Sequence, residues 1–183
     1  GEMDLAKSLI ESCDVYFYEL ALKVGIERIN EMATQLGLGI QHDVPMSAIT
    51  KGLVPSREWK LKNREQEWLV GDTVNASIGQ GYVLSSPLQL AVMVARLASG
   101  RNVKPMLTKS INGQNVHDDK EFEDLKVGKT NLNIIRKALF KASNDRRGTA
   151  YGSRIINNKY RMAGKTGTSP VSYTHLTLPT SSW

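Results

Sequence analysis

The chain has 183 residues, of which 40% are hydrophobic and 23% are charged, a composition typical of one globular domain or a large piece of a bigger one. Its 24 basic residues exceed its 18 acidic ones, but they form no single patch and are not interleaved with aromatic residues, so we expect no nucleic-acid partner. The single cysteine, Cys13, excludes an intrachain disulfide, and the three histidines are scattered without ligand spacing, so we expect no metal and no cofactor.

The N-terminal part of the chain has apolar side chains at helical spacing. Between residues 4 and 24 this spacing is interrupted at Ser12-Cys13-Asp14, where Ser and Asp compete for backbone hydrogen bonds, so two helices are expected to meet there. Gly25 would end the second helix, and a third would follow and stop at Gly37. Residues 38–83 are predicted to be mostly irregular.

A clear helix start follows at Ser86-Pro87-Leu88-Gln89, with a Ser cap, Pro at the first position and Gln three residues after the cap. This helix should stop at Gly100, and its apolar residues lie nearly all round, so we expect a central, buried helix. Residues 104–111 predict a strand, and the turn 112–114 leads to a second short strand.

The last quarter of the chain mixes loops, one helix and one strand. Residues 117–129 are expected to form a polar loop, Thr130 to cap a helix, and residues 146–152 to form a turn. Residues 160–169 (YRMAGKTGTS) predict a strand whose glycines permit a close backbone approach. Helices first, then strands with one helix between them, indicate an α+β fold.

Two short runs carry side chains suited to chemistry. On a strand, alternate side chains point the same way, so Lys165 would face a cleft and Gly167 would leave room for a substrate backbone. Thr168 could bind a carboxylate or help to hold an oxyanion. Ser12 and Asp14 offer a hydroxyl and a carboxyl group, and a serine beside a protonated lysine can relay a proton to a leaving amine. Taken alone, each run is better explained as ordinary structure.

The turns IGQG (78–81) and RRGTA (146–150) lack the glycine and lysine pattern of phosphate-binding loops. We interpret both as tight turns that line or support the cleft. Trp59 and Trp68 are interpreted as packing anchors of the long irregular segment.

The order of these runs resembles one family. Penicillin-binding proteins and serine β-lactamases carry Ser-x-x-Lys, a Ser-x-Asn-like triplet and Lys-Thr-Gly in that order. The chain resembles the second and third elements, and it is similar in particular to the transpeptidase domain of the class B, elongation-type penicillin-binding protein 2 family. The resemblance covers residues 4–169 and rests on SCDVYFYELALKVGI, GLVPSREWK, WLVGDTVNASIGQGYVLSSPLQLAVM, RRGTAYG and MAGKTGTS.

The resemblance implies a role for each site residue. Ser12 would be the proton-relay hydroxyl, and Asp14 would stand at the Asn position, a departure from the general pattern that suits this subfamily. The charge of Lys165 would serve both the relay and a substrate carboxylate. The wall of the site would consist of Lys165, Thr166, Gly167 and Thr168.

The resemblance also implies a reaction. A serine of Ser-x-x-Lys would attack the bond between two D-alanines of a peptidoglycan stem peptide, and an amine of a neighbouring stem would resolve the acyl-enzyme into a cross-link. β-Lactam antibiotics would acylate the same serine. The implied partners are the cell-wall elongation proteins, including a glycosyltransferase. The implied location is the periplasmic face of the bacterial inner membrane, reached through an N-terminal anchor helix that this chain does not contain.

One departure from the family pattern affects activity. The chain has no Ser-x-x-Lys, since Lys60 follows Ser56 by four positions, and the family places this element several dozen residues before Ser12. We therefore expect residues 1–169 to be an internal fragment, a partial transpeptidase domain that lacks the N-terminal part of the fold and is catalytically inactive as given. Residues 170–183 match one reading frame of a transposase-type library adapter and are predicted to be non-native.

Other functions stay open at this point. A serine β-lactamase or β-lactam sensor of the same fold would share the triplet and Lys-Thr-Gly, but would not be expected to carry the long PSREWK…WLVGDT segment. A non-catalytic scaffold module of the wall-elongation machinery would lack Ser-x-x-Lys by nature. Strongly salt-dependent DNA binding would instead indicate a nucleic-acid binder.

Overall fold

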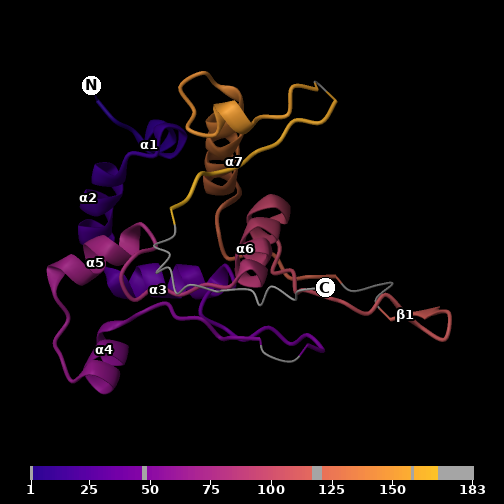
Figure 1. Ribbon diagram of the computed structural model, residues 1–183, viewed down its shortest axis with the longest axis horizontal. Helices are drawn as coiled ribbons and strands as arrows, with labels where there is room; N and C mark the ends of the chain where they lie inside the picture. Colours follow the sequence, from indigo (N-terminus) through magenta and orange to yellow (C-terminus); the bar gives the residue numbers. More distant parts are fainter. Residues whose placement is uncertain (1, 47–48, 117–120, 158, 169–183) are drawn as a thin grey trace, which may run out of the picture.

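The computed structural model describes residues 2–46, 49–116, 121–157 and 159–168, so the predicted tail at 170–183 lies outside the described residues (Figure 1). Within this part the fold is helical with one small antiparallel sheet, and the predicted α+β class is confirmed. The elements are α1 (Leu5–Glu11), α2 (Asp14–Val24), α3 (Ile26–Gln35), α4 (Arg57–Arg64), α5 (Val70–Ser77), α6 (Pro87–Ser99), β1 (Ser110–Ile111), β2 (Gln114–Asn115), α7 (Lys129–Asn144) and the 3-10 helix η1 (Tyr151–Ser153).

The predicted break between the first two helices is confirmed at Ser12. Ser12 ends α1 in a left-handed conformation (φ 53°, ψ 53°), and Asp14 is the first residue of α2. The left-handed residue turns the chain, because it cannot continue a right-handed helix. Gly25, at φ 83°, separates α2 from α3 as predicted.

The helices form two packed groups. α1 packs against α7, which also contacts α6 and η1, whereas α2 packs against α5 and α3. Figure 1 shows α1 beside α7 in the upper part of the molecule and α2, α5 and α3 gathered lower down. Ser12 and Asp14 therefore lie where one group passes into the other. Buried apolar side chains of these helices include Ile10, Ala21, Ile26, Ala76, Ala138 and Ala142.

Helices α4 and α5 lie in the segment that was predicted to be mostly irregular. Lys60 of α4 is only 2% exposed and forms an ion pair with Asp72 of α5 at 2.6 Å. Asp72 also accepts a hydrogen bond from the backbone N–H of Leu69 at 2.7 Å, at the start of α5. The prediction failed because apolar spacing counts Lys60 as a surface residue, whereas here it is the buried residue of its helix.

Both tryptophans of this segment make packing contacts. The ring of Trp59 lies 5.2 Å from that of Tyr82, measured between centroids, and Trp68 donates from its indole nitrogen to the Thr73 hydroxyl at 2.8 Å. These contacts fix the α4 and α5 region beside the turn that begins at Ile78, in agreement with the predicted role of packing anchors.

Helix α6 begins as predicted, with a reciprocal capping box between Ser86 and Gln89, and it ends at Gly100. It is not buried all round. Gln89, Val92 and Arg96 are buried, whereas Val94 is 58% exposed. The exposed residues Leu90 and Val94, four positions apart, lie on one face of α6 that the described residues leave uncovered, which is why the prediction of a buried helix was wrong.

The first strand of the sheet is shorter than predicted, since β1 begins at Ser110 rather than at residue 104, and β2 is the predicted second short strand. α7 is capped by Gly128 rather than Thr130. The predicted strand at 160–169 is not formed in its described part, 160–168. This extended segment is held by hydrogen bonds to helix groups, such as that from the N–H of Gly164 to the carbonyl of Leu139 at 3.1 Å, and no neighbouring strand pairs with it in the part of the chain that the structure describes.

None of the helices in the described ranges combines the length and apolar character needed to cross a bilayer.

Candidate active site

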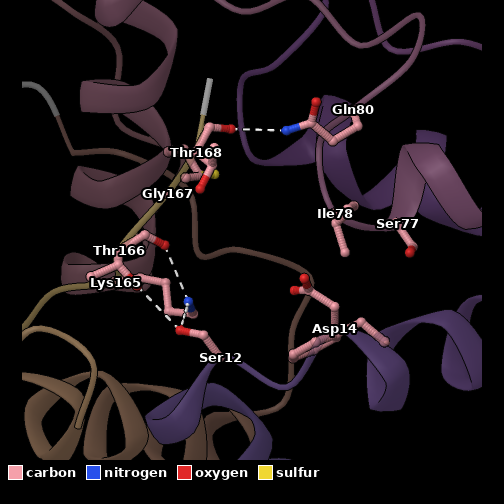
Figure 2. Close-up of a pocket in the computed structure, with 11 residues that line it drawn as sticks. Ser12, Asp14, Ser77, Ile78, Gln80, Lys165, Thr166, Gly167 and Thr168 are labelled. Atoms are coloured by element: carbon pink, nitrogen blue, oxygen red, sulfur yellow. Dashed lines mark hydrogen bonds between the residues drawn. The ribbon is translucent and has the colours of Figure 1, made fainter. Parts of the chain in front are cut away.

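A cavity of about 530 Å³ lies between the α1–α2 junction, the turn after α5 and the extended segment 165–168 (Figure 2). The structure brings together all six residues that the sequence singled out, although they come from opposite ends of the chain. They are Ser12, Asp14, Lys165, Thr166, Gly167 and Thr168.

Lys165 and Ser12 form the central contact of this cavity. The Lys165 ammonium donates to the Ser12 hydroxyl at 2.5 Å and to the backbone carbonyl of Thr166 at 3.1 Å. Figure 2 shows both hydrogen bonds, with Asp14 across the cavity from them. A hydroxyl that accepts from an ammonium group keeps its own proton free to donate, which is the arrangement that a proton relay requires.

The charge state of Lys165 depends on two opposing effects. Partial desolvation of the ammonium group in the cavity lowers the pKa of Lys165 below its ordinary value of 10.5, although the residue as a whole is exposed. The Asp14 carboxylate opposes this shift, because it attracts the positive charge and so raises the pKa. Asp14 therefore influences the pKa of Lys165 through its charge, although none of the described hydrogen bonds or ion pairs joins the two side chains.

Two further hydroxyls surround Ser12. Its Oγ lies 2.9 Å from Thr149 Oγ1 and 3.2 Å from Thr166 Oγ1, and the two threonine oxygens are 2.9 Å apart. The sequence predicted a supporting role for the RRGTA turn, which the structure confirms. The sequence did not single out Thr149, because no local pattern along the chain can indicate a contact with Ser12, which lies 137 positions away.

The IGQG turn lines the cavity as predicted. Ile78 and Gln80 both face it, while Gly79 and Gly81 take positive φ angles of 74° and 70° that favour glycine. Gln80 donates from its side-chain nitrogen to the backbone carbonyl of Thr168 at 2.9 Å (Figure 2). The turn therefore holds the segment that carries Lys165 against the rest of the site.

A second cavity, of about 590 Å³, lies between residues 40–45 and 104–116. Its buried polar side chains already bond to the backbone: Arg96 donates to the carbonyls of Gln35 and Val103, and His42 bonds to the carbonyl of Gly37. Arg96 joins α3 to α6 and His42 fixes the loop after α3, so we assign this cavity a structural role. Within the ranges that the structure describes, no cluster of three or more His, Cys, Asp or Glu residues is placed to bind a metal ion.

The fold and the Ser12–Lys165 pair together define the class of penicillin-binding proteins. The chain belongs to the penicillin-binding protein transpeptidase domain family, whose description, "Penicillin binding protein transpeptidase domain", applies to residues 1–177. The predicted resemblance to penicillin-binding protein 2 is confirmed by curated relatives and by solved structures.

Several curated relatives carry the name peptidoglycan D,D-transpeptidase MrdA, and two of them serve as examples. The relative from Acinetobacter baumannii is 34% identical over 172 residues, which is 93% of this chain and 26% of that protein. The relative from Haemophilus influenzae is 32% identical over 176 residues, which is 93% of this chain and 27% of that protein. The chain thus spans about a quarter of the length of these relatives.

Solved structures of penicillin-binding protein 2 share the fold, among them the following two. A complex between penicillin-binding protein 2 and MreC from Helicobacter pylori matches with a TM-score of 0.82 and 32% identity, over 96% of this chain and 32% of that one. Penicillin-binding protein 2 of Pseudomonas aeruginosa in complex with WCK 5153 matches with a TM-score of 0.81 and 36% identity, over 90% of this chain and 38% of that one.

Proposed function

We propose that this chain is part of a peptidoglycan D,D-transpeptidase that cross-links stem peptides through an acyl-serine intermediate, in cell-wall elongation and cell-shape maintenance. The proposal is supported above all by one observation, the hydrogen bond from the Lys165 ammonium to the Ser12 hydroxyl inside the cavity. The names of the relatives, peptidoglycan D,D-transpeptidase, agree with it.

In the proposed reaction Ser12 and Lys165 move one proton. When the bond between the two D-alanines breaks, the leaving nitrogen takes the Ser12 hydroxyl proton, and Ser12 recovers a proton from the Lys165 ammonium. The carbonyl carbon forms an ester bond with the nucleophilic serine, whose proton would pass to the lysine of Ser-x-x-Lys. A new N–H bond forms on the leaving amine and Lys165 becomes neutral, so protons and charge balance. Thr166, Gly167 and Thr168 would receive the substrate backbone and its carboxylate along the exposed side of this segment.

The nucleophile of this reaction is proposed to lie outside the 183 residues. The chain contains no Ser-x-x-Lys, and it covers only 26% and 27% of the two MrdA relatives. We infer that the chain by itself is inactive and forms no covalent adduct with penicillin. We also infer that the longer protein is the target of β-lactams.

Partners and location belong to the proposal as well. The Helicobacter pylori structure is a complex with MreC, and a further structure at 29% identity and a TM-score of 0.78 is described as "Structural coordination of polymerization and crosslinking by a peptidoglycan synthase complex". By analogy we propose that the whole protein works with wall-elongation proteins, among them a glycosyltransferase. It would act on the periplasmic face of the inner membrane, held there by an anchor helix.

Fluorescent penicillin labelling tests the proposed function. The full-length protein should become labelled, the isolated 183-residue chain should not, and Lys165→Ala in the full-length protein should slow labelling by about 100-fold or more, since a positioned proton donor contributes at least that much. Lys62→Ala, which removes the same charge from the exposed face of α4, should label at the normal rate.

Three results would argue against the proposal. Labelling of the isolated chain would contradict its inactivity. An unlabelled full-length protein would favour a non-catalytic scaffold, and rapid hydrolysis of the acyl-enzyme would favour a β-lactamase. Cross-linking of a stem peptide ending in D-Ala-D-Ala would separate a transpeptidase from a β-lactam sensor.

We also propose that residues 170–183 are non-native. The family match continues to residue 177, so the nucleotide sequence has to decide. Codons for residues 171–180 that differ from the adapter sequence would contradict this assignment.

A further inference from the structure

Thr149 completes a ring of three hydroxyls beside Lys165. The three oxygen–oxygen distances, between Ser12 and Thr149, Thr149 and Thr166, and Thr166 and Ser12, are 2.9, 2.9 and 3.2 Å. A hydroxyl has one proton to donate and two lone pairs, so each member can donate to one neighbour and accept from the other. When Lys165 and Thr149 both donate to Ser12 Oγ, its two lone pairs are used and its own proton points to Thr166 or to a leaving amine.

The turn that carries Thr149 is fixed by backbone contacts to two helices. The N–H of Thr149 donates to the carbonyl of Ile10 at 3.1 Å, one of the last carbonyls of α1, which have no partner within that helix. The N–H of Ala150 donates to the carbonyl of Ala142 on α7, also at 3.1 Å. Thr149 is thus attached to the same helix that ends at Ser12.

Gly148 permits this close attachment. A Cβ atom at position 148 would lie 2.1 Å from the carbonyl oxygen of Ala142, well inside contact distance. An ion pair between Arg147 and Glu11 at 3.5 Å also joins the turn to α1, but it is largely exposed and contributes little. The position of the Thr149 hydroxyl therefore rests on backbone hydrogen bonds and on the absence of a side chain at 148.

We propose that Thr149 is a positioning residue for the Ser12–Lys165 proton relay. Its hydroxyl holds Ser12 Oγ in line with the Lys165 ammonium and donates to that oxygen while the Ser12 proton passes to the leaving amine. The inference rests on the proposed function, because it assigns Thr149 a part in the same proton transfer. Thr149 acts through Ser12 and makes no contact with the substrate.

The geometry argues for positioning rather than for packing. Thr149 is an exposed residue, so its side-chain methyl group contributes little to the stability of the fold through burial. Its hydroxyl, by contrast, contacts the hydroxyls of Ser12 and Thr166, the two residues to which the Lys165 ammonium donates. Removing the hydroxyl should therefore change the orientation of the relay more than it changes the fold.

The test compares variants in the full-length protein, using fluorescent penicillin and separating its reversible binding from the acylation step. Thr149→Val keeps the side-chain shape and removes the hydroxyl; it should slow acylation by about tenfold, less than loss of the proton donor itself, while reversible binding changes by less than twofold. Thr149→Ser keeps the hydroxyl and should restore acylation to within about twofold. Thr130→Val, the same change at an exposed position of α7, is the control.

The outcomes separate this inference from the proposed function. If the wild-type protein is not acylated, the proposed function fails and the role of Thr149 fails with it. If the wild type is acylated but Thr149→Val reacts at the normal rate, or Thr149→Ser is as slow as Thr149→Val, only the role of Thr149 is overturned. Thermal melting checks that each variant folds, and Thr149→Ala replaces Thr149→Val if the latter does not.

Discussion

The ammonium group of Lys165 donates to the hydroxyl of Ser12 across 153 positions of sequence. Two structural features produce this contact: the left-handed end of α1 exposes the Ser12 side chain to the cavity, and the IGQG turn holds the segment that follows Lys165. A proton relay built from such distant segments depends on both the charge state of the lysine and the packing of the turns around it. The predictions below address these two dependences.

The first prediction concerns the pH dependence of acylation in the full-length protein. The relay needs protonated Lys165, so acylation should fall as pH rises through the pKa of Lys165, which desolvation places below 10.5. Asp14→Asn removes the carboxylate that raises this pKa, so the alkaline loss should begin at a lower pH. Rates of penicillin acylation across pH measure both effects.

Glu19→Gln serves as the control for this experiment. It removes one negative charge from an exposed position of the same helix, α2, without altering the cavity lining. If the alkaline fall in the acylation rate shifts to lower pH by the same amount in both variants, net charge rather than the placement of Asp14 sets the pKa of Lys165.

The second prediction concerns the ion pair between Lys60 and Asp72. Lys60→Met leaves the Asp72 carboxylate, which is 14% exposed, without its cation. Loss of one partner of a buried pair costs about 3 kcal/mol, at the lower end of the usual range because Asp72 keeps its hydrogen bond from Leu69. Urea unfolding of the protein measures this loss. Lys62→Met on the exposed face of α4 should change the free energy of unfolding by less than about 0.5 kcal/mol.

The same pair gives stability a defined acid dependence. Burial raises the pKa of Asp72, but the hydrogen bond from Lys60, the Leu69 N–H and the charge of Lys60 outweigh it, so the pKa lies below its ordinary value of 3.8. A carboxyl group with a lowered folded-state pKa stabilises the fold above its unfolded pKa and loses that contribution as pH falls through the folded value. The difference in unfolding free energy between wild type and Lys60→Met should therefore narrow below pH 3.8; a constant difference would contradict this account.

The third prediction compares two glycines of one turn. Gly148→Ala places a Cβ atom 2.1 Å from a backbone oxygen of α7, and no side-chain rotation can relieve that contact. The turn must move, which should cost about 1–3 kcal/mol of stability and slow penicillin acylation because Thr149 moves with it. Gly152→Ala meets nothing within 4 Å and should leave both properties unchanged. Equal effects in the two variants would show that the close approach at position 148 is unimportant.

The fourth prediction concerns Gln80. Gln80→Ala removes the hydrogen bond to the carbonyl of Thr168, so the backbone from Lys165 to Thr168 should open more often. A net hydrogen bond contributes about 1 kcal/mol, so amide hydrogen exchange of Gly164, whose N–H donates to the carbonyl of Leu139 directly before this segment, should become up to about fivefold faster. Gln66→Ala, on the exposed loop between α4 and α5, is the matched control and should leave exchange there unaltered.

The sequence predicted those helices that have an apolar face or a clear end signal. The α1–α2 break and the start of α6 depend on residues that are neighbours in the sequence, so both could be predicted, at Ser12 and at Ser86. α4 and α5 were missed because contacts with other elements hold them: α4 is held by the ion pair from Lys60 to Asp72, and α5 packs against α2. α5 contains Gly, Asn and Ser, which form helices poorly, and the buried residue of α4 is a lysine.

The candidate site was predictable from its motifs but not from local geometry. Ser12, Asp14 and residues 165–168 were placed together by resemblance to a family, and the structure brings them to one cavity. Thr149 and its contact with Ser12 depend on how the 146–152 turn sits on α1 and α7, a tertiary arrangement that no spacing along the chain reports. The strand at 160–169 was predicted from composition, whereas a strand needs a hydrogen-bonded neighbour.

The two packed groups of helices are joined along the chain by the three residues 12–14. Ser12 ends α1, which is packed against α7, while Asp14 begins α2, which is packed against α5. A movement of one group against the other changes the distance between the Asp14 carboxylate and Lys165, and with it the Coulomb energy that favours the charged lysine. The pKa of Lys165 therefore depends on how closely the two packed groups of helices are held together around the cavity.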